Sequence, residues 1–199
     1  PFTLDEVKLI IDHARADYKN YYTTRFFTGM RTGEIDGLQW KFVDFDRRQI
    51  LIRQALVENE LVYTKNDGSF RTIDMSDVVY TALRSQFEAT GQYEFVFCNT
   101  VGGPLRHNNV TKRVWRPLLK YLGLRIRRPY QTRHTAATLW LAAGESPEWI
   151  ARQMGHTTTE MLFRVYSRYV PNLTRQDGSA FERLLAANGL KEVSDDTES

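Results

Sequence analysis

The sequence predicts an α+β fold, in which one mostly helical domain carries a small three-stranded antiparallel sheet. Apolar residues recur at helical spacing along most of the chain, and one region, residues 42–75, changes to the alternation of β-strands. With 42% hydrophobic and 13% aromatic residues, the 199-residue chain can bury a core. We expect the domain to span residues 1–187 and an acidic, frayed tail to follow at 188–199.

The N-terminal part predicts two helices and a helical turn. Thr3 and Glu6 have the spacing of a capping box, and an apolar stripe follows them. A second helix is expected from about residue 18 to residue 28, because Gly29 then provides a stop signal. A short helical turn follows "RTGE" and ends near Leu38.

The sheet is expected in the next segment. "KFVDFDRRQILIRQ", residues 41–54, alternates around an Asp-Arg-Arg turn. "ELVYTKNDGSFRTIDM", residues 60–75, contains two strand-like runs joined by "NDG", which is a typical hairpin signal. These segments together predict the three antiparallel strands.

The remainder of the chain is predicted to be helical. Helical spacing and end signals predict further helices at 77–89, 108–122, about 131–143, 147–154, 158–167 and 179–187. The segments between them contain Gly, Pro or Asn, as in "CNTVGGP" and "LAAGESP". No internal repeat or low-complexity tract interrupts this pattern.

Composition excludes several classes of protein. A single cysteine, Cys98, excludes a disulfide framework and a cysteine-ligated zinc site. No signal peptide is visible and no apolar run approaches 18 residues, so we expect a soluble intracellular protein that has no membrane partner. The chain opens on "PFTLDEV" without an initiator methionine, and we expect it to be a piece of a longer protein.

The net charge of +3 is modest, but its distribution is uneven. No acidic residue occurs between Phe95 and Gly144, a window that holds nine Lys or Arg residues. Solvated basic faces are common, but they normally mix both signs of charge, so this window favours a polyanion such as nucleic acid. The basic residues that we expect to contact DNA are Arg106, Lys112, Arg113, Arg116, Arg127 and Arg128.

Metal and nucleotide chemistry have little support. The four histidines lack the close spacing of a helical metal motif, and "TVGGP" lacks the lysine and helix of a phosphate loop. Scattered carboxylates leave a metal-dependent nuclease as an alternative. Taken alone, Arg31 and Glu34 in "TGMRTGE" read as a surface ion pair at a helix start.

Four stretches in a fixed order change that interpretation. They are "TGMRTGEIDGLQW" at 28–40, "YTKNDGSFRTIDM" at 63–75, "YQTRHTAATLWLAAG" at 130–144 and "WIARQMGHTTTEMLFRVYSRYV" at 149–170. With these motifs the chain resembles the catalytic domain of the tyrosine recombinase, or phage integrase, family, from "FTLDEV" to about "FERLL". The resemblance implies a mainly helical fold with a small sheet. It also implies breakage and rejoining of DNA without a metal or nucleotide cofactor.

The resemblance assigns roles to individual residues. Arg31 and Arg133 would bind non-bridging oxygens of the scissile phosphate, since planar guanidinium groups offer two parallel donors to developing negative charge. Glu34 would orient Arg31, and His156 would hydrogen-bond the phosphate. Lys65 would donate a proton to the departing 5′-oxygen, although without the other motifs it would read as a surface lysine.

One position departs from the family pattern. Most members have a histidine three residues before the second arginine, and this chain has Tyr130 there. That histidine is the usual candidate for accepting the nucleophile's proton, whereas a tyrosine is a poor base at neutral pH. Tyr130 stays a candidate site residue of open role, and water, His156 or another group would then take the proton.

Spacing selects the nucleophile. The family places it about nine or ten residues after the histidine of the "GH" pair, and Tyr166 is ten residues after His156. Tyr169 is thirteen residues after His156 and is expected to pack. A phenolate leaves readily enough for a DNA hydroxyl to reverse a phosphotyrosine link.

The sequence therefore predicts a site-specific DNA recombinase, the integrase of a phage or integrative element. Its expected partners are double-stranded recombination sites, a homotetramer in the full-length protein, and accessory DNA-bending or directionality proteins. Its expected location is the prokaryotic cytoplasm, on DNA. The alternatives are a type IB topoisomerase, which shares the chemistry, and a DNA-binding module without catalysis.

Overall fold

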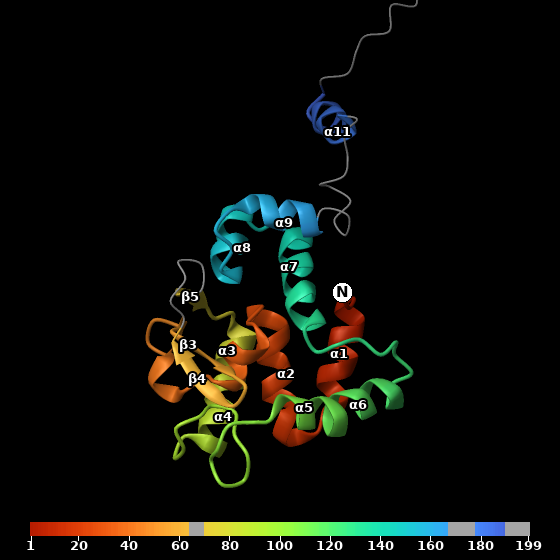
Figure 1. The fold of residues 1–199 in the computed structure, drawn as a ribbon. Helices are drawn as coiled ribbons and strands as arrows, with labels where there is room; N and C mark the ends of the chain where they lie inside the picture. The colour runs from red at the N-terminus through yellow and green to blue at the C-terminus, as the bar shows by residue number, and fades with distance from the viewer. Residues whose placement is uncertain (64–69, 167–177, 190–199) are drawn as a thin grey trace, which may run out of the picture.

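The computed structural model describes residues 1–63, 70–166 and 178–189 (Figure 1). Most of these residues are helical, as predicted. The α-helices are α1 (Leu4–His13), α2 (Ala16–Thr28), α3 (Thr32–Asp36), α4 (Asp77–Thr90), α5 (His107–Val110), α6 (Arg116–Tyr121), α7 (Gln131–Ala143), α8 (Pro147–Met154), α9 (Thr159–Tyr166) and α11 (Ser179–Ala187). A 3₁₀ turn, η1 (Trp40–Phe42), precedes the sheet.

Local signals account for the helix ends. The Thr3 hydroxyl accepts a hydrogen bond from the Glu6 amide at 3.1 Å, and the Glu6 carboxylate accepts one from the Thr3 amide at 2.9 Å, which confirms the capping box. Helix α8 begins with Ser146 as its N-cap and Pro147 in its first turn. Helices α2 and α7 end at the left-handed glycines Gly29 and Gly144.

The predicted three-stranded antiparallel sheet is confirmed. Its strands are β1 (Val43–Asp44), β2 (Gln49–Ile52) and β5 (Arg71–Asp74), with β2 in the centre. In the register, Val43 lies opposite Ile50, and Ile50 lies opposite Ile73. The two isoleucines are fully buried, so this face of the sheet contributes to the core.

The predicted pairing across "NDG" is wrong for the described residues. The run before it, β4 (Glu60–Tyr63), pairs with β3 (Gln54–Val57) in a separate two-stranded sheet, whereas the run after it is β5. The competing turn is Glu58-Asn59, where φ is +50° and +69°. Two consecutive residues with positive φ suit a two-residue hairpin, so this tight turn determines the partner of β4. "NDG" itself lies at 66–68, outside the described residues.

The helix predicted at 108–122 forms in three sections. Between α5 and α6, residues Thr111–Trp115 (η2) have π-type hydrogen bonds. The change coincides with Pro117, which has no N–H to continue the α-helical ladder. The exposed side of this helix carries Lys112, Arg113, Arg116 and Lys120, and the opposite side is buried.

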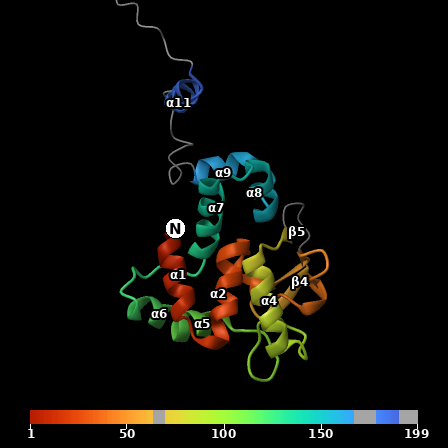
Figure 2. The same cartoon turned by 180° about the vertical axis from the view of Figure 1, so that it is seen from behind.

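Two hydrophobic clusters organise the molecule. The larger one joins α1, α2, α4, the three-stranded sheet and the helix at 107–121, around Trp115 and Phe26. The smaller one joins α7, α8 and α9 through Ala137, Leu141, Ile150, Met154, Leu162 and Tyr166. Figures 1 and 2 show α7, α8 and α9 grouped together, on the side away from α5 and α6. No helix of the described ranges has the length and apolar composition needed to span a membrane.

Candidate active site

The turn after α2 positions the first predicted arginine. Gly29 ends α2 with φ of +62°, and a Cβ at this position would lie 3.1 Å from the Met154 sulfur and 3.2 Å from the Trp140 ring. Glycine is therefore required both by the left-handed backbone and by the close approach of α7 and α8. Two residues later Arg31 becomes the N-cap of α3.

Glu34 joins two arginines beneath this turn. Its carboxylate is 2% exposed and accepts hydrogen bonds from Arg31 Nη1 at 2.9 Å and from both Arg71 Nη atoms at 2.8 Å. Burial alone would raise the pKa of Glu34, but the hydrogen bonds and charge of Arg71, together with Arg31, outweigh burial and lower this pKa. The two guanidiniums also donate to α8 and its C-cap, Arg71 to the Gln153 carbonyl at 2.7 Å and Arg31 to the Gly155 carbonyl at 3.3 Å.

Arg133 is the most buried cation of the cluster, at 2% exposure. It projects from the first turn of α7 and donates to the Gly29 carbonyl at 2.6 Å and to the Met154 carbonyl at 2.5 Å. Burial, followed by the charge of Arg31, lowers the pKa of Arg133 to about 10. The guanidinium therefore stays protonated at neutral pH, and carbonyl dipoles hold it in place.

His156 lies beside Arg133. It follows Gly155, which ends α8 with φ of +67°, and its Nε2 is 3.4 Å from Arg133 Nη2. Burial and the charges of Arg133, Arg31 and Arg71 lower the pKa of His156 to about 4, so its imidazole is neutral at pH 7. Within the described part of the chain, its buried Nδ1 has no hydrogen-bond partner.

The cluster formed by Arg31, Glu34, Arg71, Arg133 and His156 has an excess of positive charge. Three guanidiniums face one carboxylate and a neutral imidazole, which leaves a net charge of about +2 from three positive groups and one negative group. Positive charge that is partly removed from water attracts anions strongly. Guanidinium groups match the geometry of a phosphate, so the cluster can bind a phosphodiester and stabilise added negative charge on it.

A second buried arginine, Arg25, connects the elements that carry the cluster. Arg25, 1% exposed, donates to the Tyr21 hydroxyl at 2.9 Å and to the Thr32 hydroxyl at 2.9 Å. It also donates to the Pro129 carbonyl at 3.2 Å, just before α7. Arg25 therefore ties α2 to α3 and to the start of α7, the elements that carry Arg31 and Arg133.

Tyr166 ends α9 and is almost fully buried, at 2% exposure. Its hydroxyl oxygen lies 2.9 Å from Nδ1 of His134 on α7, and the two ring centroids are 5.5 Å apart. Tyr130, 44% exposed, packs edge-on against His134, with the two ring centroids 5.1 Å apart. Lys65 and Tyr169 lie outside the described residues.

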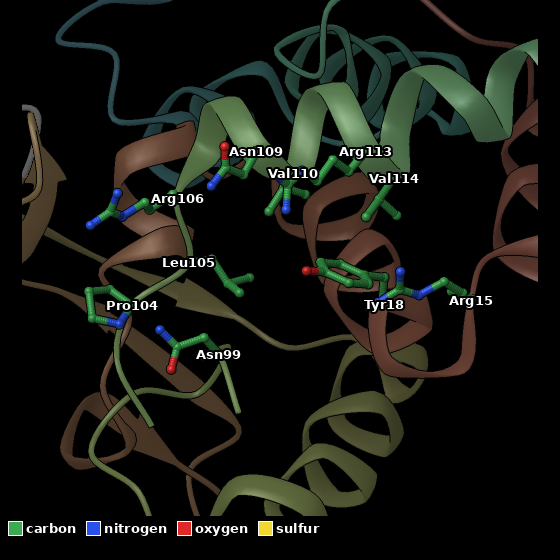
Figure 3. Close-up of a pocket in the computed structure, with 10 residues that line it drawn as sticks. All are labelled: Arg15, Tyr18, Asn99, Pro104, Leu105, Arg106, Asn109, Val110, Arg113 and Val114. Carbon is green, nitrogen blue, oxygen red and sulfur yellow. The ribbon is translucent and has the colours of Figure 1, made fainter. Parts of the chain in front are cut away.

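The predicted DNA-binding residues are mostly exposed. Arg106 and Arg113 line a cavity of about 530 Å³ between the helix at 107–121 and α2, together with Arg15 (Figure 3). A neighbouring cavity extends from Arg106 to Thr32, next to Arg31. Lys112, Arg116 and Arg128 are also exposed. Arg127 differs from them, because its guanidinium pairs with Glu6 at 3.0 Å and lies over the Phe2 ring.

The structure thus brings four predicted residues together, namely Arg31, Glu34, Arg133 and His156, and adds two that the sequence reasoning missed. Arg71 shares Glu34 across a sequence separation of 37 residues, and no local pattern signals such a contact. His134 directly follows Arg133, so the motif did contain it, but one residue along a helix is a rotation of roughly 100°. Within the described residues, no group of three or more His, Cys, Asp or Glu side chains is arranged to hold a metal ion.

The chain matches one protein family over most of its length. A family model described as "Phage integrase family" matches residues 2–172, and the chain belongs to that family. Prophage integrase IntR of Escherichia coli K12 is 26% identical over 198 residues, which cover 87% of this chain and 48% of the relative. Putative defective protein IntQ of the same organism is 31% identical, over 85% of this chain and 50% of the relative.

The fold also matches solved structures. The Tn1549 transposon integrase in complex with circular intermediate DNA aligns with a TM-score of 0.75 and 23% identity, over 92% of this chain and 66% of that one. At this identity the match bears on the fold, which confirms the predicted fold class. The chain spans about half the length of the curated relatives it matches.

Proposed function

We propose that this chain is the catalytic part of a site-specific DNA recombinase that cleaves and rejoins DNA through Tyr166. The observation that carries the proposal is the cluster of three guanidiniums, in which Arg31 and Arg71 share the buried Glu34 carboxylate and Arg133 is held by backbone carbonyls. Such a cluster is suited to a phosphodiester. Membership of the phage integrase family supports the same reading. The Tn1549 relative was solved with DNA, which makes double-stranded DNA the natural partner to propose here.

In the proposed reaction, the Tyr166 oxygen forms a bond to the scissile phosphorus and the bond to the 5′-oxygen breaks. The products are a 3′-phosphotyrosine and a free 5′-hydroxyl, and a DNA hydroxyl reverses the step on the partner strand. Arg31, Arg133 and His156 bind the phosphate oxygens, and Lys65 protonates the departing oxygen. Loss of one such phosphate contact is expected to cost on the order of 10²–10³ in rate.

The proposed chemistry determines whether the reaction needs an energy source or a cofactor. The phosphotyrosine link conserves the energy of the broken bond, so the reaction needs neither nucleotide nor metal. DNA would extend from the cluster across the neighbouring cavities, where Arg106 and Arg113 contact phosphates. In the full-length protein we propose a tetramer on DNA, linked through C-terminal segments. The exposure of Phe181 and Leu184 on α11, at 61% and 59%, supports such a contact.

The test is covalent capture in excess chelator. Nicked duplexes that lose the 5′-hydroxyl fragment after cleavage should trap a protein–DNA adduct with the unmodified protein and none with Tyr166→Phe. The Tyr166→Phe protein should still bind DNA. Activity that disappears with chelator and returns with Mg²⁺ would instead identify a nuclease, and binding without any adduct would identify a DNA-binding module. Strand exchange that needs a defined pair of sites separates a recombinase from a topoisomerase.

A further inference from the structure

An aromatic trio formed by Tyr130, His134 and Tyr166 lies beside the arginine cluster. His134 is half-buried on α7, one residue after Arg133. Its Nδ1 lies 2.9 Å from the Tyr166 hydroxyl, a distance normal for an O–H···N hydrogen bond. With the imidazole hydrogen on Nε2, the hydroxyl donates and Nδ1 accepts. Arg133 and His134 thus place a phosphate ligand and a tyrosine contact at consecutive positions of one helix.

The proposed reaction requires a proton acceptor at this point. A phenol is a weak nucleophile and attacks efficiently only as its proton leaves, which an adjacent base assists. Tyr130 is poorly suited to that role, because tyrosine is not a base near neutral pH. Its ring instead packs edge-on against His134, with the centroids 5.1 Å apart, which limits how the imidazole can turn.

His156 is also a weaker candidate. Its Nε2 lies beside Arg133, at 3.4 Å. Burial and three neighbouring guanidiniums hold its pKa at about 4, and such an imidazole accepts protons poorly at neutral pH. Its position suits a hydrogen bond to the phosphate better than removal of a proton from Tyr166.

We propose that His134 is the catalytic base of this chain, which accepts the Tyr166 proton on Nδ1 as the tyrosine oxygen attacks the phosphorus. The assignment rests on the proposed function above. As the new O–P bond forms, the O–H bond electrons stay on oxygen and the proton moves to the imidazole. The 5′-oxygen leaves with a proton from another donor, for which we propose Lys65. In rejoining, His134 returns its proton to Tyr166.

The packing around Tyr166 supports this geometry. Tyr166 is buried in the smaller hydrophobic cluster, together with Leu162 on its own helix and with Met154 and Leu141 from α8 and α7. The hydroxyl end is the polar end of the side chain, and it reaches His134. The cluster that fixes the phenol therefore also fixes its distance from the imidazole.

The experiment measures the rate of covalent adduct formation on a pool of nicked duplexes with randomised sequence around the nick. His134→Asn keeps a polar group that can hydrogen-bond the hydroxyl but cannot accept its proton, and the rate should fall by about 10²–10⁴. His13→Asn is the matched control, because His13 is exposed and its Nδ1 hydrogen-bonds the Leu9 carbonyl of its own helix. Its rate should equal that of the unmodified protein. DNA binding should be unchanged in both variants.

Two further measurements separate a base from a packing residue. Placing 3,5-difluorotyrosine at position 166 makes the phenol more acidic, so it depends less on a base. In the His134→Asn variant, this replacement should raise the rate of adduct formation by at least about ten-fold. Free imidazole should likewise accelerate His134→Ala. Thermal unfolding of each variant shows that it is folded before the rates are compared.

The outcomes distinguish this assignment from the proposed function. An adduct that forms with the unmodified protein and at the same rate with His134→Asn overturns the role of His134 alone. A rate that falls but is restored neither by the fluorinated tyrosine nor by imidazole also overturns it, in favour of packing. No adduct with the unmodified protein overturns the proposed function, and the assignment with it.

Discussion

Glu34 is the residue on which the arginine cluster depends, because its buried carboxylate is shared by the guanidiniums of Arg31 and Arg71. The Arg71 side chain is 7% exposed and that of Glu34 is 2% exposed. Desolvation of such charges is costly, and it is offset when close partners and further hydrogen bonds surround them. The pair therefore matters less as a source of stability than as a fixed support for Arg31.

Glu34→Gln tests this dependence. The variant leaves the buried Arg71 and the partly exposed Arg31 without their carboxylate. Breaking a buried pair such as Arg71–Glu34 costs about 3–5 kcal/mol of unfolding free energy. Asp17→Asn is the control, because the Arg15–Asp17 pair is well exposed and should contribute less than about 1 kcal/mol. Urea unfolding at neutral pH measures both. If the two variants lose equal amounts of unfolding free energy, the buried Glu34 pairs contribute no more to stability than the exposed Arg15–Asp17 pair.

The lowered pKa of His156 predicts that the stability of the protein depends on pH. Its folded-state pKa of about 4 is below the ordinary histidine value near 6.5, so the folded protein resists protonation while the unfolded chain does not. Its contribution is therefore fully present above about pH 6.5 and is lost as the pH falls toward 4. His156→Gln removes this term, so unfolding free energies measured across that range should converge on or cross those of the unmodified protein as the pH falls. A constant difference between the two proteins would contradict the prediction.

Single residues were predictable where a motif carries them. Arg31, Glu34, Arg133 and His156 could be found from motifs, and the structure places them side by side. Arg71 could not be found in this way, because its role comes from a contact between β5 and α3 that depends on the register of the sheet. The chemical roles of all these residues stay predictions.

At the scale of elements, the position of α3 is set by close contact with β3. A Cβ at Gly33 would lie 2.6 Å from the Leu56 carbonyl oxygen, which is backbone and cannot move aside alone. Helix α3 carries Glu34 and follows its N-cap Arg31, so a shift of this helix moves Arg31, a proposed phosphate ligand, and its carboxylate partner. Gly33 is thus required for close approach of the two backbones.

Gly33→Ala should therefore destabilise the protein by about 1–3 kcal/mol and slow adduct formation. Alanine normally stabilises a helix by up to about 1 kcal/mol relative to glycine, so a net loss would report the clash. Gly144→Asn is the control, because no atom lies within 4 Å of a Cβ there and asparagine tolerates positive φ. The unfolding free energy and the rate of adduct formation are measured for both variants. A stabilised, fully active Gly33→Ala protein would contradict this account.

The helix at 107–121 makes a separate prediction about DNA. Its exposed arginines, Arg113 and Arg116, should contact phosphates, which position a duplex without reading its sequence. Each Arg→Ala change should lower the salt slope of binding by roughly one unit and weaken binding to target and random duplexes alike. Arg47→Ala, an exposed residue in the β1–β2 turn, provides a comparison. If the salt slope of binding is unchanged in both Arg113→Ala and Arg116→Ala, this face of the helix contacts solvent and not DNA.

Elements with clear end signals were predicted well, and the pairing of strands was not. Helices α7, α8 and α11 have the predicted limits, because glycines, Ser146 and Pro147 mark the helix ends nearby. Strand β4 was assigned the wrong partner, because two turn signals competed and Glu58-Asn59 formed the tighter hairpin. A turn motif reports a local preference, whereas pairing depends on which strands also bury a common face.

For the whole molecule, the candidate site lies where the two hydrophobic clusters meet. Arg133 from the smaller cluster binds the end of α2, and Arg31 and Arg71 from the larger one bind carbonyls at the end of α8. The spacing of apolar residues predicted one mostly helical domain, but it could not predict that the core divides at the site. Tyr166, Arg133 and His156 of the proposed reaction therefore lie on or next to the helices of the smaller cluster. Arg31 lies next to an element of the larger one, and these contacts align it with the other three.

The proposal that Tyr166 is the nucleophile is tested most directly by identifying the tyrosine that becomes linked to DNA. Trypsin separates the two candidates, since cleavage after Arg164, Arg168 and Arg175 gives "VYSR" with Tyr166 and "YVPNLTR" with Tyr169. Mass spectrometry of the digested adduct should find the nucleotide remnant on Tyr166, and Tyr169→Phe should still form the adduct. A remnant on Tyr169, or an adduct formed by Tyr166→Phe, would contradict the account.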